Sequence, residues 1–139
     1  MNNPKIVEWV LRIAVAGEFI GHGVFALGGK QAWIEWFPVF GISAPEPATT
    51  LLFLVGIMDV TLGLLVLIKP VPIALLWMAM WGFWTALVRP IVGEPIWDFV
   101  ERGANWGAPL ALLLILGWPK NLKEWFRGPA SLRQTGSQN

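Results

Sequence analysis

The chain has 139 residues, of which 55% are hydrophobic and only 14% are charged, with a formal net charge of +1 and no cysteine. The absence of cysteine excludes disulfides, thiol redox chemistry and iron–sulfur clusters within this chain, and we expect no nucleic-acid partner. A chain so rich in apolar residues indicates a membrane protein rather than a soluble domain.

Four apolar segments each approach the roughly 20 residues that a helix needs to cross a bilayer. They cover residues 7–28, 48–68, 71–92 and 97–118, and glycine and proline separate them. None of them alternates polar and apolar residues as the strand of a membrane barrel would. The sequence therefore predicts an all-α fold, a bundle of four transmembrane helices in one domain over residues 1–127. Residues 128–139 are polar and predict a disordered tail.

The basic residues favour one side of this four-span arrangement. Lys5, Lys69, Lys120, Lys123, Arg127 and Arg133 fall on one side, and Lys30 falls on the other with Glu35, Glu46 and Glu94. The positive-inside rule then predicts that both termini, and the tail, are cytoplasmic. Ala14-Val15-Ala16 resembles a signal cleavage site, but Glu8 and Arg12 interrupt the apolar run before it, so we expect no cleavage there.

Aromatic residues form two helical patterns. Trp33, Trp36, Phe37 and Phe40 recur at i, i+3, i+4 and i+7 in the connection after the first span. This predicts a short helix in the outer interface, more readily as a bilayer anchor than as a lid over a cavity. Trp77, Trp81 and Trp84 recur within the third span. This pattern is more typical of ordinary packing or lipid contact. The alternative interpretation is an aromatic wall for a planar ligand such as a quinone head group.

Ionisable residues lie inside the predicted spans, where a charge at the centre of a helix costs roughly 2.5–3.5 kcal/mol. The first span contains Glu8, Arg12, Glu18 and His22, the only histidine. At 100° per residue these four side chains share one face. Glu8 with Arg12, and Glu18 with His22, are spaced i, i+4 and close enough to pair. We expect this face to point into the bundle.

A second polar group opens the fourth span. Asp98, Glu101, Arg102 and Asn105 follow i, i+3, i+4 and i+7, so they are predicted to share one helix face. In the expected orientation this group lies in the outer half of the bilayer, as do Glu18, His22 and Arg89, while Asp59 lies near the midplane. The sequence thus predicts one outward-facing polar pocket, with Glu8 and Arg12 apart on the cytoplasmic half.

Two interpretations of these charges remain open. Arg12, Arg89 and Arg102 could simply neutralise the carboxylates and hold the helices in register, although the number of charges in one half of the bilayer favours a site. In a site, Glu18, His22 and Asp59 are the candidate catalytic groups for proton transfer, and arginines could hold an anion or polarise a carbonyl. The candidate ligand-binding residues are Trp81, Trp84, Arg89, Asp98, Glu101, Arg102 and Asn105. We expect no metal, because one histidine is too few and its spacing from Glu18 is not the Glu-x-x-His of di-iron bundles.

Several stretches resemble the DoxX/DoxD-like family of small membrane proteins. They are Leu11-Arg12 with Gly17, Phe19, Gly21 and Gly29-Lys30, the loop Phe40-Gly41-Ile42-Ser43-Ala44-Pro45, and Leu54-Val55-Gly56-Ile57-Met58-Asp59 followed by Gly63-Leu64-Leu65. The family commonly has an acidic residue at the position of Asp59. The resemblance covers the first half of the chain, and the second half only by span count. His22 and the 94–105 cluster lie outside the matched pattern.

The resemblance implies a four-helix integral membrane protein, and we expect it to lie in the bacterial inner membrane.

 Some members of that family are the small subunit of a thiosulfate:quinone oxidoreductase, and others are partners of oxidative-stress enzymes, so the resemblance implies a role of this kind. The leading hypothesis is a DoxX-like protein that binds a small ligand, such as a quinone, in the polar pocket and supports membrane redox or proton transfer. The alternatives are an accessory subunit or assembly factor of a larger membrane complex, with protein partners or further copies of itself, and a small proton-coupled transporter.

Overall fold

The computed structural model describes residues 3–127, and the predicted tail at 128–139, with Arg133, lies outside them. Every regular element in the described part is helical. In chain order these are α1 (Pro4–Leu27), α2 (Gln31–Ile34), the 3₁₀ turn η1 (Phe37–Phe40), α3 (Pro45–Ile68), α4 (Pro72–Ile91), α5 (Ile96–Val100), α6 (Gly103–Leu116) and α7 (Leu122–Phe126).

Three of these helices, α1, α3 and α4, are long and apolar enough to cross a membrane. They coincide with the first three predicted spans, although α1 and α3 begin earlier than predicted, at Pro4 and Pro45. Proline is well tolerated at the first helical position, because a backbone N–H there would have no acceptor within the helix. Pro45 and Pro72, which suggested breaks in the sequence, are therefore the first residues of α3 and α4.

The prediction of one continuous fourth span was wrong. Residues 96–116 form two helices, α5 and α6, with a break at Glu101 and Arg102. Arg102 leaves the helical conformation, and Gly103, a weak helix former, follows it. α6 alone has 14 residues and a length of about 21 Å. Asp98 and Asn105 consequently lie on different helices rather than on one shared face.

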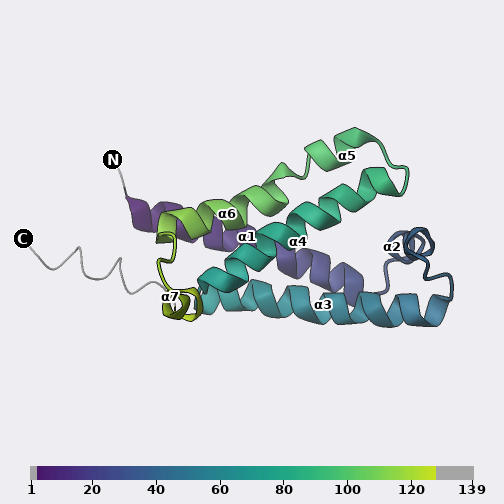
Figure 1. Cartoon of the computed structure of the whole chain (residues 1–139), viewed down its shortest axis with the longest axis horizontal. Helices are drawn as coiled ribbons and strands as arrows, with labels where there is room; N and C mark the ends of the chain where they lie inside the picture. The colour runs from purple at the N-terminus through teal and green to yellow at the C-terminus, as the bar shows by residue number, and fades with distance from the viewer. Residues whose placement is uncertain (1–2, 128–139) are drawn as a thin grey trace, which may run out of the picture.

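The helices form an elongated bundle with two distinct ends (Figure 1). One end, called here the α2–α5 end, carries α2 and α5, and the other, the α7 end, carries α7 and the start of α1. α1 packs mainly on α3, α4 packs mainly on α6, and α1 joins the two pairs by contacting α6. α3 and α4 are consecutive but make few close contacts, so the seam between them is loosely packed.

Glycines bring the paired helices together. A Cβ atom on Gly56 would lie 2.8 Å from the backbone nitrogen of Leu27 and 2.9 Å from the backbone oxygen of Gly23. α1 and α3 therefore touch backbone to backbone, as small residues allow in membrane helix pairs. On the other pair, a Cβ on Gly82 would collide with the carbonyl of Asn105. Pro109, four residues after Asn105, has no N–H to bond that carbonyl, which leaves it free to lie against Gly82.

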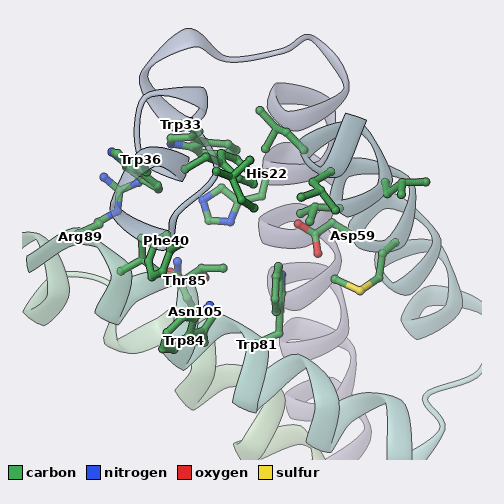
Figure 2. A pocket seen from close by; sticks show the side chains of 18 of the residues that line it. His22, Trp33, Trp36, Phe40, Asp59, Trp81, Trp84, Thr85, Arg89 and Asn105 are labelled. Carbon is green, nitrogen blue, oxygen red and sulfur yellow. The ribbon is translucent and has the colours of Figure 1, made fainter. Parts of the chain in front are cut away.

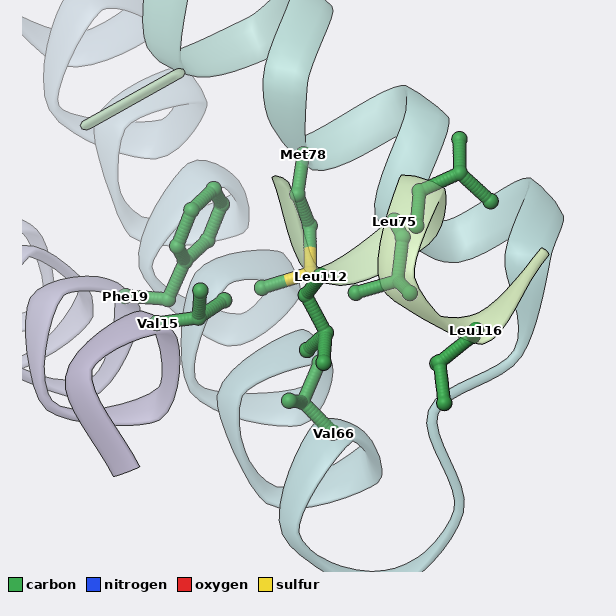
Figure 3. Close-up of a cluster of buried hydrophobic side chains, with 8 residues drawn as sticks. Val15, Phe19, Val66, Leu75, Met78, Leu112 and Leu116 are labelled. Atoms are coloured by element: carbon green, nitrogen blue, oxygen red, sulfur yellow. The ribbon is translucent and has the colours of Figure 1, made fainter. Parts of the chain in front are cut away.

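The apolar core lies toward α7, whose Trp125 packs against it, and Figure 3 shows its buried side chains. Its side chains come from all four long elements: Val15, Phe19, Val66, Leu75, Met78, Leu112, Leu113 and Leu116. The outside is also apolar, with Ile13 and Met80 each 61% exposed. Such surfaces are suited to contact with lipid tails.

Arg12 ties α1 to the end of α3. Its Nη1 lies 3.2 Å from Oε1 of Glu8, which confirms the predicted pair. Its Nε donates a hydrogen bond of 3.0 Å to the carbonyl of Val66, and its Nη2 donates another to the carbonyl of Leu67. The last carbonyls of a helix lack partners within the helix and favour a cation. Arg12 is thus a structural group, remote from the pocket described next.

Candidate functional site

A cavity of about 470 Å³ occupies the α2–α5 half of the bundle (Figure 2). α3 and α4 form its sides, and the segment containing α2 and η1 covers it. Its volume is in the usual range for sites that take small organic ligands. The cavity therefore lies where the packed core ends.

Aromatic rings form much of the cavity wall. Those from the α2–η1 segment are Trp33, Trp36, Phe37 and Phe40, and those from α4 are Trp81 and Trp84. The predicted single interfacial helix is instead two short turns, α2 and η1. All four of its aromatic side chains line the cavity, which supports the lid interpretation over the anchor. Phe40 lies 6.1 Å from Trp84 between ring centroids, so the lid contacts α4 directly.

Asp59 is the most unusual polar group in the cavity. Its side chain comes from the middle of α3, is only 4% exposed, and points into the cavity. Within residues 3–127 its Oδ1 has no hydrogen-bond partner, and Trp81 lines the cavity with it (Figure 2). A buried carboxylate without an ion pair is costly, and such groups in membrane proteins mark functional sites.

His22 faces the same space from α1. Its Nδ1 lies 3.1 Å from Oε1 of Glu18, which confirms the predicted pair and leaves Nε2 as the ring nitrogen for a ligand. The imidazole packs edge-on against Trp33, with 5.5 Å between ring centroids. Glu18 itself does not line the cavity. It orients His22 rather than reaching a ligand.

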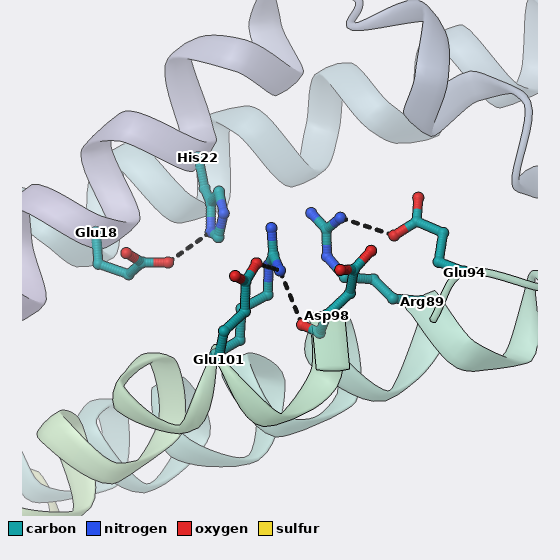
Figure 4. A network of polar contacts seen from close by, with 7 residues as sticks. Glu18, His22, Arg89, Glu94, Asp98 and Glu101 are labelled. Atoms are coloured by element: carbon teal, nitrogen blue, oxygen red, sulfur yellow. Dashed lines mark hydrogen bonds and ion pairs between the residues drawn. The ribbon is translucent and has the colours of Figure 1, made fainter. Parts of the chain in front are cut away.

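Two arginines, Arg89 and Arg102, line the cavity, and Figure 4 shows Arg89 beside Glu94. Nη1 of Arg89 lies 2.9 Å from Oε2 of Glu94, and its guanidinium lies over the ring of Trp36, 5.1 Å from the centroid. Arg102 pairs with Glu101 and donates a hydrogen bond of 2.8 Å to the carbonyl of Asp98. Both arginines are therefore already neutralised, but both still present part of their side chains to the cavity.

The structure brings together most of the predicted site residues, but not all of them. His22, Asp59, Trp81, Trp84, Arg89, Arg102 and Asn105 line the cavity. Glu18, Asp98 and Glu101 do not, and the last two serve to hold Arg102. The break between α5 and α6 explains why Asp98 and Glu101 do not line the cavity, because it removes the helix face on which their prediction depended.

Other lining residues were not predicted as site residues. Thr85 lies one turn from Trp81 and from Arg89 on α4, so i, i+4 spacing was a signal that could have identified it. The wall from α3 includes Leu51, Leu54, Val55 and Met58. α3 is apolar on almost every side. Asp59, four residues after Val55, was a polar residue that could have marked the inward face.

No family model, curated protein or solved structure matches the chain. The site must therefore be interpreted from its own chemistry. Within residues 3–127 no group of three or more histidine, aspartate or glutamate side chains could hold a metal ion. The cavity offers planar aromatic walls, a carboxylate, an imidazole, a hydroxyl, an amide and two guanidinium groups. This set suits a flat, mostly apolar molecule with a few hydrogen-bonding atoms.

Proposed function

We propose that this chain is an integral membrane protein of DoxX-like type that binds a quinone-class ligand in the cavity between α3 and α4. Asp59 and His22 would exchange protons with the ligand head group while a partner protein oxidises or reduces it. Trp81, Trp84 and the lid aromatics would stack on the ring, and Asn105 and Arg102 would donate hydrogen bonds to its oxygens.

The observation that carries this proposal is Asp59. Its carboxyl group is buried in an aromatic cavity, and Oδ1 has no hydrogen-bond partner among the described residues. A structural ion pair would have placed an arginine beside it, as happens for Glu8, Glu94 and Glu101. A ligand that donates or accepts a proton supplies the missing partner.

The proposal includes a fourth crossing of the membrane. α5 and α6 together cover residues 96–116, which would span about 31 Å if they stacked end to end. Both ends of the chain would then lie on the side of α7, where Lys5, Lys69, Lys120 and Lys123 gather, and this side would be cytoplasmic. The cavity would open toward the opposite side of a bacterial inner membrane.

Ligand binding can be measured through the tryptophans of the cavity. The protein is reconstituted in nanodiscs and titrated with a benzoquinone, whose ring quenches nearby indoles. We expect saturable quenching, and about tenfold weaker binding in Asp59→Leu. Trp97→Phe is the matched control, because Trp97 is 72% exposed and does not line the cavity. Equal affinity in the wild-type protein and Asp59→Leu would overturn the proposal.

A wild-type protein that binds no quinone at all would favour the accessory-subunit alternative. Mass spectrometry of small molecules extracted from the purified protein is an independent measurement. We expect a redox-active aromatic compound in the wild-type extract and less of it in the Asp59→Leu extract.

A further inference from the structure

A second hollow lies between α3 and α4, on the α7 side of the cavity. It has a volume of about 360 Å³ and is lined by Leu62, Ile73, Ala74, Leu76, Trp77 and Met80. All of these side chains are apolar or aromatic, unlike those of the cavity. It therefore has room for an apolar group but no means of recognising a polar one.

The two hollows share continuous stripes on both helices. On α3, Leu51, Val55 and Met58 line the cavity and Leu62 lines the second hollow, at i, i+4, i+7 and i+11. Because these spacings return to the same helix face, one face of α3 runs past both spaces.

α4 provides the matching stripe from the opposite side. Trp84 and Trp81 line the cavity, and Trp77 and Ile73 line the second hollow. Trp77 stacks on Trp81 with 6.1 Å between ring centroids and 10° between planes. The two indoles thus form one wall that passes from the polar space to the apolar space.

This seam is open toward the surroundings of the bundle. Leu54 and Trp84 at the cavity are 55% and 43% exposed, and Trp77 and Met80 at the second hollow are 46% and 61% exposed. α3 and α4 pack mainly on other helices, not on each other. In the membrane proposed above, this side of the bundle would face lipid tails and not water.

We propose that the ligand carries a long apolar tail, of isoprenoid type, which lies along the α3–α4 seam while its head group occupies the cavity. This inference rests on the proposed function and specifies its ligand class: a lipid-soluble quinone that enters sideways from the bilayer. From Trp81 to Ile73 the seam extends about 12 Å along α4. Asp59 and Trp81 are the last residues of the cavity lining toward the second hollow, and the lining beyond them is apolar or aromatic. A molecule with a polar head and an apolar tail requires this arrangement.

The test compares a benzoquinone that has a decyl tail with the same head group without a tail. Leu62→Trp fills the second hollow, and Leu64→Trp is the matched control, because Leu64 is 49% exposed on the same helix and lines neither hollow. In Leu62→Trp we expect about tenfold weaker binding of the tailed quinone and unchanged binding of the tail-less one. Comparing variants with the same ligand removes the effect of the tail on partition into the nanodisc.

A second measurement does not depend on any variant that could misfold. A quinone with a photoreactive group at the end of its tail is cross-linked to the wild-type protein, and the modified residues are mapped by mass spectrometry. We expect cross-links at Leu62 and within 73–80 that excess unlabelled tailed quinone suppresses. Cross-links spread around the whole outer surface, or equal binding of the tailed quinone to Leu62→Trp and wild type, would overturn the tail site.

These outcomes separate the two proposals. If the tail-less quinone binds and Asp59→Leu weakens it, while the seam variants change nothing, the head-group site stands and the tail site fails. If neither quinone binds the wild-type protein, the proposed function is wrong, and the tail site, which rests on it, is wrong as well. If the seam binds phospholipid acyl chains or a second copy of the chain, tailed quinone will not displace them, and the tail site fails.

Discussion

Asp59 of α3 and Trp81 of α4 line the same cavity (Figure 2), at a place where these two helices make few close contacts. Asp59 is nearly inaccessible, and its Oδ1 has no hydrogen-bond partner within the described chain. The pair stands at the boundary between a cavity with polar groups and a purely apolar hollow. A bundle built for stability alone would have an apolar residue at position 59.

Replacing Asp59 by leucine should therefore stabilise the ligand-free protein while it weakens quinone binding. Removing an unpaired buried carboxylate is expected to raise the free energy of unfolding by about 1 kcal/mol, measured by thermal unfolding in detergent. Glu35→Gln is the control, since Glu35 is exposed and should change stability by less than about 0.5 kcal/mol. Lower stability in Asp59→Leu would show that the carboxylate supports the fold, contrary to the site interpretation.

Arg12 should behave in the opposite way. Arg12→Met removes the donors to the carbonyls of Val66 and Leu67, so the free energy of unfolding should fall by about 3 kcal/mol. Glu8→Gln should cost at most about 1 kcal/mol, because Glu8 is partly exposed. Quinone binding should be unchanged in both variants, which distinguishes this structural pair from Asp59. Weaker quinone binding in Arg12→Met at full folding would contradict that separation.

The sequence predicted this division of roles in part. The i, i+4 spacing was enough to identify the Glu8–Arg12 and Glu18–His22 pairs, because both partners lie on one unbroken helix. The same reasoning failed for Asp98 and Asn105, because it assumed a continuous helix through Gly103. Length and apolarity sufficed to find α1, α3 and α4, but a break within an apolar segment depends on local backbone choices that those quantities do not report.

The cavity wall was harder to predict than its polar groups. A buried aspartate or arginine stands out in an apolar span, whereas Leu51 and Met58 resemble every other residue of α3. The aromatic pattern of 33–40 was visible, but the same spacing suits an interfacial anchor and a lid. The structure distinguishes between them, because all four side chains line the cavity and Phe40 packs on Trp84.

The close contact of α1 with α3 should depend on Gly56. Gly56→Ala places a methyl group against the backbone of Leu27 and Gly23, so the two helices must separate, at a cost of about 1–3 kcal/mol in the free energy of unfolding. Gly21→Ala is the matched control on α1, because a Cβ there meets nothing within 4 Å. Its better helix propensity should leave stability unchanged or slightly higher. Equal losses in the two variants would mean that alanine acts through the helices themselves and not through their contact.

Arg89 should hold the lid over the cavity. It joins Glu94 by an ion pair and Trp36 by a cation–π contact, so Arg89→Gln releases both. We expect faster hydrogen exchange in residues 31–40, by about fivefold, which corresponds to about 1 kcal/mol of lost protection. Arg102→Gln is the control, because Arg102 bonds to Asp98 and Glu101 and not to the lid. Exchange in 31–40 that is the same in both variants would assign the lid's stability to its aromatic packing alone.

The natural absence of cysteine makes the membrane arrangement directly testable. Single cysteines at Lys5, Lys30 and Lys120, all exposed positions, can be labelled in whole cells with a membrane-impermeant maleimide. If α5 and α6 together complete a fourth crossing, Lys5→Cys and Lys120→Cys lie on one side and resist labelling, while Lys30→Cys reacts. Permeabilised cells provide the control, because all three positions should then react. If Lys120→Cys is labelled like Lys30→Cys and Lys5→Cys is not, α5 and α6 do not cross, and the cavity would be bounded by only three spanning helices.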